Sequence, residues 1–207
     1  MSGVTARVSR GRRPGAPDTR AEVLAAARTS FAEKGFRGTT IRAVAASAGV
    51  DPALVHHYFG SKDDLFLAAL EMPVDPRTIL APVVAQGPDG AGERLLRTFL
   101  SVWDEPDIQV RLLAVVRSVL GADGGRLLKD GFIPVVVGPV LAQLVRDRPD
   151  VRIPLVASQV VGLIVTRYLL ALPQMAQMPA EDVVARIGPV LQHYLTGDLG
   201  GGVDATG

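Results

Sequence analysis

The side chains with the clearest chemistry lie between residues 39 and 62. Arg42 and Lys62 are cations, and His56 and His57 are hydrogen-bonding groups that can also become cations. A guanidinium such as that of Arg42 can donate to N7 and O6 of one guanine in the major groove of DNA. This set of side chains therefore favours binding of an anionic, hydrogen-bonding partner.

The adjacent histidines His56 and His57 also suggest a metal site or a pH-sensitive site. Neighbouring positions of a helix point about 100° apart, so the two rings do not converge on one ion. No third ligand lies nearby in the sequence. We therefore expect no metal at this pair.

Two short helical patterns separated by a glycine must position these side chains. The first pattern places four apolar residues on one stripe at helical spacing: Ile41, Val44, Ala45 and Ala48. Gly49 favours a left-handed backbone after it, and Asp51 followed by Pro52 is typical of the start of a second helix. Helix, glycine turn and helix is the shape of a DNA-binding helix-turn-helix. The pattern alone fits a purely structural helical hairpin as well.

The residue string is more specific than the pattern. It resembles the N-terminal domain of the TetR/AcrR family of bacterial transcriptional repressors over roughly residues 19 to 70. The resemblance is carried by Phe31, Gly35, Thr39, Thr40, Ile41, Ala45, Gly49, Val50, Phe59, Ser61, Lys62 and Leu65. One departure is His56, where the family most often has tyrosine, so a phenol contact to phosphate becomes an imidazole contact.

The resemblance implies a set of DNA contacts. It places four residues at phosphates, namely Thr40, His56, Tyr58 and Lys62. It places five toward base edges, namely Arg42, Pro52, Ala53, Leu54 and His57. We expect His56 to bind phosphate as a neutral imidazole. Because Pro52, Ala53 and Leu54 have no side-chain donors, recognition is expected to use DNA shape as well as base contacts.

Composition favours an all-α fold with two domains. The chain has 207 residues, 48% of them hydrophobic, and strand-type alternation is scarce. We expect an N-terminal three-helix DNA-binding domain with a helix-turn-helix and a C-terminal helical ligand-binding and dimerisation domain. The expected divisions are a flexible basic arm over 1–17, the DNA-binding domain over 18–66, the regulatory and dimerisation domain over 67–197, and a flexible tail over 198–207.

Charge is divided between the two halves of the chain. Residues 1–66 hold 10 Lys or Arg and 6 Asp or Glu, a charge of +4, and residues 67–207 hold 12 and 15, a charge of −3. The positive part coincides with the helix-turn-helix, as expected for a domain that faces phosphates. In the arm, Arg10, Arg12 and Arg13 either form a solvated tail or lie in the minor groove.

Local signals predict the remaining helix boundaries. Thr19 and Glu22 form a capping-box pattern at the start of the first helix, Gly35 ends it, and Ser61 caps a fourth helix. Later helices are expected over residues 76–86, 91–104, 107–120, 123–146 with a break, 151–172 and 180–195. Pro189 should kink or restart the last helix.

The last two helices are expected to form the dimer interface, as the family resemblance implies. The first has small residues at a spacing of four that permits close approach, namely Ser158, Gly162 and Thr166. The second has a matching apolar stripe, namely Val183, Ile187, Val190, Leu191 and Tyr194. The alternative is that both helices are buried within a monomer.

The resemblance also implies a ligand pocket in the C-terminal domain. Candidates are large or polar residues within apolar helical runs: Phe99, Trp103, Leu113, Arg117, Val136, Gln159 and Tyr168. The apolar surroundings favour a small hydrophobic ligand, aromatic or acyl. The same residues also suit an ordinary core.

Several classes of protein are disfavoured. The chain has no cysteine, no Gly-rich phosphate loop and no HExxH or GxSxG motif, so we expect neither an enzyme nor a cofactor. No apolar segment of about 20 residues is evident, so we expect no membrane span and a cytoplasmic protein. The preferred function is a ligand-responsive repressor that binds a palindromic operator as a homodimer. The alternatives are a dimeric small-molecule-binding protein without DNA binding and an all-helical enzyme.

Overall fold

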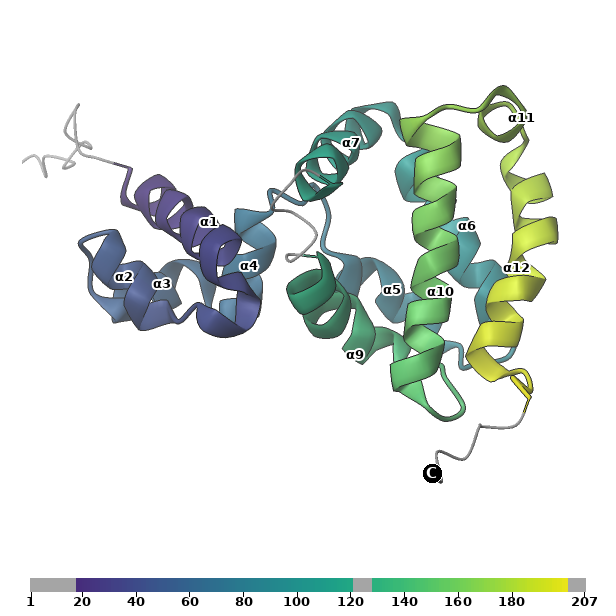
Figure 1. The fold of residues 1–207 in the computed structure, drawn as a ribbon, viewed down its shortest axis with the longest axis horizontal. Coiled ribbons are helices and arrows are strands. Elements are labelled where there is room, and N and C mark those ends of the chain that lie inside the picture. Colours follow the sequence, from purple (N-terminus) through teal and green to yellow (C-terminus); the bar gives the residue numbers. More distant parts are fainter. Residues whose placement is uncertain (1–17, 121–127, 201–207) are drawn as a thin grey trace, which may run out of the picture.

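The computed structural model describes residues 18–120 and 128–200, and in these residues every regular element is a helix (Figure 1). The N-terminal part contains α1 (Thr19–Gly38), α2 (Ile41–Ser47), α3 (Pro52–Phe59) and α4 (Lys62–Ala69). The rest contains α5 (Pro76–Ala85), α6 (Ala91–Trp103), α7 (Pro106–Leu120), the π-helix η1 (Leu128–Val137), α9 (Gly138–Leu141), α10 (Pro149–Leu163), the π-helix η2 (Ile164–Leu169), α11 (Pro173–Ala176) and α12 (Ala180–Thr196).

The start and end of α1 follow from local chemistry, with one correction. The N-cap is Asp18, whose carboxylate accepts from the backbone N–H of Ala21, so the predicted capping box at Thr19 was wrong. Asp18, one residue earlier, already accepts from one of the free amides of the first turn. At the other end, Gly35 has φ 68° and interrupts the helical backbone, but α1 continues to Gly38 and does not end at Gly35 as predicted.

The N-terminal domain is built around an aromatic cluster. Phe31, Phe36 and Phe66 pack with ring centroids 5.0 to 6.0 Å apart, and Phe31 and Phe66 are almost completely buried. Val44, Val55 and other apolar side chains of α2 and α3 complete this core. The short helix pair is therefore fixed by burial against α1 and α4.

The π-helix η1 joins the two halves of the molecule. Val136 is 1% exposed and belongs to the core of the N-terminal domain, with Phe132 and Val137 packed at its edge. A Cβ on Gly131 would lie 2.5 Å from Cζ of Phe66. π-helical segments are rare and are often found at functional sites. The contact of η1 with the N-terminal core is therefore a candidate functional feature.

The C-terminal domain is held by a close crossing of α6 and α12, which lie side by side in Figure 1. A Cβ on Gly92 would lie 2.4 Å from the carbonyl oxygen of Gly188, so only glycine fits at this crossing. The amide of Gly92 donates to Oε1 of Gln192 at 2.9 Å. α12 continues through Pro189 without restarting.

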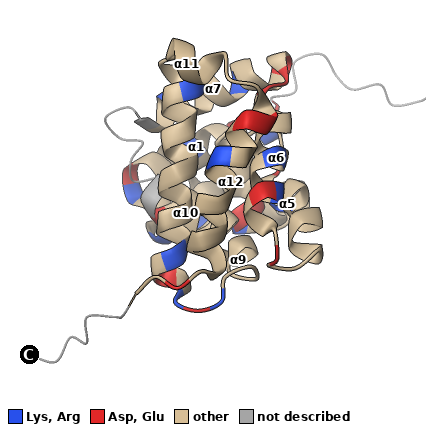
Figure 2. Ribbon diagram, turned by 90° about the vertical axis from the view of Figure 1, so that its right-hand side faces the viewer, with Lys and Arg blue, Asp and Glu red and all other residues tan. Residues whose placement is uncertain are grey.

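The helix formed by α10 and η2 is more apolar than the sequence analysis expected. Pro149–Leu169 is 21 residues long, and by length and composition alone it could cross a membrane. Only 22% of its most apolar window is buried within the protomer, and most of the α10 ribbon carries no charge (Figure 2). Its two arginines, Arg152 and Arg167, are buried and donate to backbone carbonyls.

Candidate nucleic-acid interface and ligand cavity

The turn between α2 and α3 is fixed by backbone hydrogen bonds and caps. Thr40 caps α2 by accepting from the amide of Ala43 at 3.1 Å, and Asp51 caps α3 by accepting from the amide of Ala53 at 2.7 Å. Gly49 has φ 67°, a conformation that strains other residues. Local sequence thus sets where α3 begins and how the chain turns between α2 and α3.

α3 has one buried face and one exposed face. Val55 and Phe59 are buried against α1, α2 and α4, whereas the exposed side carries Ala53, His56, His57 and Tyr58. Pro52 and Leu54 are half-buried at the edge. Of the remaining predicted DNA contacts, Thr40 and Arg42 are exposed and Lys62 is half-buried. The exposed residues of α3 are therefore all among the residues predicted to contact DNA.

The two histidines of α3 differ in their hydrogen bonds. Nδ1 of His56 lies 2.9 Å from the carbonyl oxygen of Gly60. The ring of His57 instead lies beside that of Tyr58, with centroids 5.7 Å apart. His56 is thus held at the C-terminal end of α3, and its contact partner is a backbone oxygen.

Lys62 lies against an aromatic ring. Its Nζ is 4.2 Å from the centroid of Phe36, which is a cation–π contact. Partial burial lowers the pKa of Lys62, and the nearby charge of Asp63 opposes this effect. A phosphate contact by Lys62 requires one of two things. Either the ammonium leaves the ring of Phe36, or the phosphate approaches the ammonium where it lies on the ring.

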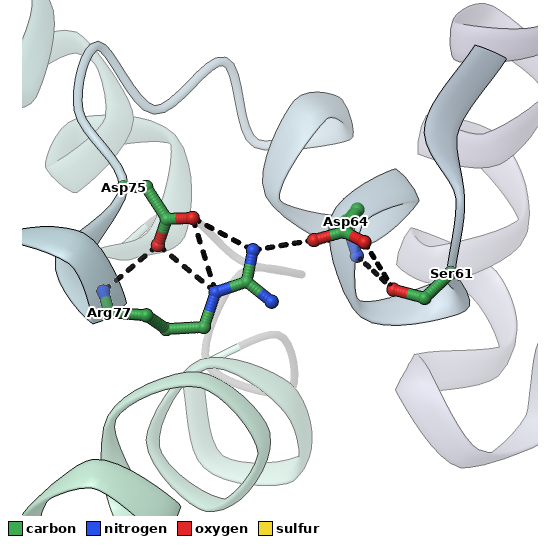
Figure 3. Close-up of polar contacts among 4 residues, drawn as sticks. All are labelled: Ser61, Asp64, Asp75 and Arg77. Atoms are coloured by element: carbon green, nitrogen blue, oxygen red, sulfur yellow. Dashed lines mark hydrogen bonds and ion pairs between the residues drawn. The ribbon is translucent and has the colours of Figure 1, made fainter.

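A polar network that the sequence analysis missed links α4 to the start of α5 (Figure 3). Ser61 caps α4 and donates to Oδ2 of Asp64 at 2.6 Å. Nη2 of Arg77 donates to Oδ1 of Asp64 at 2.5 Å and to Oδ2 of Asp75 at 2.8 Å. One guanidinium thus bridges the first turn of α4 and the N-cap of α5.

The same network shifts the ionisation of its members. The Ser61 hydrogen bond and then Arg77 lower the pKa of Asp64, and the hydrogen bond from Arg77 lowers that of Asp75. Both carboxylates raise the pKa of Arg77. The sequence signal was Asp75 before Pro76, an N-cap pattern, but the partner on α4 depends on the tertiary fold.

An apolar cavity of about 240 Å³ lies among α5, α6, α7, η1 and α10. Of the seven candidate pocket residues, Phe99 and Trp103 line it. Five further candidates, Leu113, Arg117, Val136, Gln159 and Tyr168, are not in its wall. On α7 the wall instead contains Leu112, Val115, Val116 and Val119. Their i, i+3, i+4, i+7 spacing is a helical stripe that the sequence analysis did not use.

The physical reasons for the five wrong pocket residues differ. Leu113 and Arg117 lie on the other side of α7, where Arg117 is exposed, and Val136 is in the core of the N-terminal domain. Gln159 donates to Oγ of Ser158. Tyr168 donates its hydroxyl to Asp104 at 2.8 Å and packs on Trp103 behind the wall, with centroids 5.0 Å apart.

Tyr168 is part of a polar cluster outside the cavity. Burial first, and then Asp104, raise the pKa of its hydroxyl. Nη1 of Arg167 donates to the carbonyl oxygens of Met175 and Met178 at 2.6 and 2.8 Å. This cluster fixes the end of η2 against α11, while the cavity wall itself is almost wholly apolar.

The predicted dimer residues fall into two groups. On α10 and η2, Ser158 and Gly162 are exposed, and a Cβ on Gly162 would meet nothing within 4 Å. On α12, Val183 and Leu191 are 0% exposed, so their assignment to a partner-facing surface was wrong. They pack against α6 and α10 within the protomer. The other four, Thr166, Ile187, Val190 and Tyr194, retain some exposure.

The remaining predictions concern the N-terminal arm and metal binding. Arg10, Arg12 and Arg13 of the arm lie outside the described residues. In residues 18–120 and 128–200, no group of three or more His, Asp or Glu side chains is arranged to hold a metal ion.

Comparisons with known protein families match most of the chain. A model described as the tetracyclin repressor-like C-terminal domain matches residues 89–195, slightly more than half of the chain. A model described as bacterial regulatory proteins of the tetR family matches residues 23–69.

Individual relatives are similar over shorter lengths. The helix-turn-helix-type transcriptional regulator BetI of Brucella anthropi is 44% identical over 54 residues, which is 26% of this chain and 28% of BetI. The regulator HbdR of Aromatoleum sp. (strain CIB) is 32% identical over 118 residues, covering 55% of this chain and 51% of HbdR. The chain thus spans about a quarter and about half of these curated relatives.

Solved structures are similar over nearly their whole length. A TetR-family regulator of Streptomyces coelicolor A3 has 35% identity over 89% of this chain and 98% of that chain, with a TM-score of 0.46. NalD of Pseudomonas aeruginosa, a secondary repressor of a multidrug efflux pump, has 18% identity and a TM-score of 0.43.

Proposed function

The chain belongs to the TetR family of bacterial regulatory proteins, and we propose that it is a cytoplasmic DNA-binding repressor that works as a ligand-responsive homodimer. The family is one of transcriptional regulators and not of enzymes. The observation that carries the proposal is the exposed face of α3, which a capped turn holds away from the core. In helix-turn-helix proteins this face of the second helix enters the major groove.

The proposed DNA contacts divide by chemistry. Arg42 donates to a guanine, and Ala53 and Leu54 contact thymine methyl groups. Thr40 and Tyr58 donate hydroxyl protons to phosphates, and the amides at the start of α3 favour an anion. With few side-chain donors at the start of α3, part of the specificity comes from DNA shape.

The proposed dimer uses the exposed side of the helix formed by α10 and η2. Val151 is 39% exposed, Leu170 is 62% exposed, and Ser158 and Gly162 between them leave open space for another helix. On α12 the contributing residues are Val190, which is 38% exposed, Ile187 and Tyr194. Two α3 helices about 34–36 Å apart then match successive major grooves of a two-fold symmetric operator.

The proposed ligand is small and hydrophobic, and η1 couples it to DNA binding. Ile133 and Phe132 line the cavity, whereas Val136 on the same helix lies in the core of the DNA-binding domain. A ligand that pushes η1 moves this core, and it releases DNA if it binds the displaced state more tightly.

The direct test is selection of a duplex from a random library with purified protein, followed by gel shift and sedimentation. We expect one retarded complex containing two protomers. Arg42→Ala should weaken binding about tenfold or more, because a bidentate arginine–guanine pair is worth about 1–3 kcal/mol. Arg117→Ala, the same change at an exposed site on α7, should leave affinity unchanged. Recovery of no duplex would favour a dimeric small-molecule-binding protein without DNA binding instead.

A further inference from the structure

The hydrogen bond between His56 and Gly60 decides what the imidazole can do. A carbonyl oxygen only accepts, so Nδ1 of His56 must carry the proton in this 2.9 Å contact. In the neutral ring, Nε2 is then a lone-pair acceptor. A phosphate oxygen also only accepts, so neutral His56 cannot donate to phosphate while it keeps this bond. The expectation of a neutral histidine at phosphate therefore does not fit the observed geometry.

The position of His56 favours a contact with the phosphate backbone of DNA over a contact with a base. His56 is exposed in the last turn of α3, whereas base edges are read mainly by residues at the start of a recognition helix. The C-terminal end of a helix carries partial negative charge, which stabilises a cation there. Both features suit an imidazolium that donates from Nε2 to a phosphate.

The groups around His56 provide no ion-pair partner for an imidazolium at this residue in the described part of the protomer. The charged and titratable groups on α3, on its N-cap and on α2 and α4, which pack against it, are Asp51, His57, Tyr58, Arg42, Lys62, Asp63 and Asp64, and Arg20 of α1 lies over the ring of Phe59. Lys62 lies on the ring of Phe36, and Asp64 is bound by Ser61 and Arg77. In the described part of the chain, His56 forms an ion pair with none of them.

We propose that His56 binds operator phosphate only as an imidazolium, so that each subunit takes up a proton at His56 when it binds DNA. This inference rests on the proposed function and adds a pH dependence to it. Affinity therefore rises as pH falls, and it levels off once His56 is already protonated in the free protein. A phenol or an amide at this position would donate at any such pH.

The composition makes the proposal testable, because few groups titrate near neutrality. The sequence has 3 histidines and no cysteine, and His193 lies on α12, far along the chain from α3. The rings of His56 and His57 are neighbours, yet only His56 has a tautomer fixed by a carbonyl. His193→Gln is therefore the matched control for His56→Gln and His56→Tyr, and His57→Gln, at a residue expected near base edges, is judged by its pH dependence and not by its affinity.

The experiment measures affinity for the duplex selected with the wild-type protein, by fluorescence anisotropy from about pH 8 to about pH 5.5 at constant ionic strength. Calorimetry in two buffers of different ionisation enthalpy counts the protons taken up. Circular dichroism at each pH confirms that every variant is folded.

We expect wild-type affinity to rise about tenfold or more across this range, since one proton per subunit gives at most about tenfold per pH unit per subunit. The rise and the proton uptake should disappear in His56→Gln and His56→Tyr and persist in His57→Gln and His193→Gln. Equal pH dependence in wild type and His56→Gln overturns the proposal. A fall in affinity at low pH also overturns it, because neutral Nε2 would then be accepting from a base. Absence of any duplex binding at every pH would overturn the proposed function as well.

Discussion

Arg77 donates from Nη2 to Oδ1 of Asp64 at 2.5 Å, and it thereby ties the start of α5 to the first turn of α4 (Figure 3). Because α4 packs on α1 and directly follows α3, this bond connects the two domains by a polar route. It complements the apolar contact of η1 with the N-terminal core.

The Arg77 bridge predicts a defined acid dependence of stability. The pKa values of Asp64 and Asp75 are lowered in the folded chain, so their contribution to stability is present above about pH 4 and is lost as pH falls through the lowered pKa values. Because the partners are partly exposed, Arg77→Ala should cost only about 0.5–1 kcal/mol at neutral pH. Urea denaturation at several pH values should show a smaller acid loss in the variant. An unchanged acid profile would show that the bridge does not contribute.

The close crossing of α6 and α12 predicts that Gly92→Ala is destabilising. Its Cβ would meet the backbone of Gly188 and Gln192 at 2.4 to 2.9 Å, and backbone atoms cannot move aside locally. We expect a loss of about 1–3 kcal/mol in the free energy of unfolding. Urea denaturation of Gly92→Ala and wild type measures it, and a variant as stable as wild type would contradict the packing described.

Gly162 offers the opposite case on the proposed dimer surface. A side chain there meets nothing in the protomer, so Gly162→Glu should fold normally, as judged by circular dichroism. If α10 faces a second copy, the buried charges should dissociate the dimer. Sedimentation velocity would show the monomer, and a dimer of unchanged affinity would place the interface elsewhere.

The cavity predicts selective binding of neutral apolar molecules. Trp103 is the only tryptophan in the sequence and lines the cavity, so its fluorescence reports occupancy. Naphthalene should change the emission with saturation, whereas benzylammonium should not, because the wall offers no carboxylate. Val160 also lines the cavity, so Val160→Phe should fill part of the space and weaken the naphthalene response. Equal responses to both probes would contradict an apolar site.

Local sequence predicted the helix boundaries well because caps and breakers act within a few residues. Asp51 with Pro52, Ser61, and Asp75 with Pro76 each start a helix where the sequence indicated, and Gly35 interrupts α1. Asp18 replaced Thr19 as a cap because two acceptable cap residues are adjacent. An error of this kind moves the start of the helix by only one residue.

Predictions that depend on which elements pack together were less accurate. Periodicity marked α12 as apolar, but it could not tell that Val183 and Leu191 face α6 within the protomer. Val136 was assigned to the pocket of the C-terminal domain, but its side chain packs in the core of the N-terminal domain. The sequence does not show where η1 docks. The Asp64–Arg77 bridge was missed for the same reason.

The central claim is that two copies of this chain place α3 in successive major grooves of one duplex. Hydroxyl-radical and methylation-protection footprinting on the selected duplex tests it most directly, with native mass spectrometry of the same complex. We predict two protected major-groove patches centred about 34–36 Å apart, two protomers per site and, at a protein concentration near the wild-type Kd, much weaker protection of both patches by Arg42→Ala. A single patch bound by one protomer, or full protection by Arg42→Ala, would contradict the account.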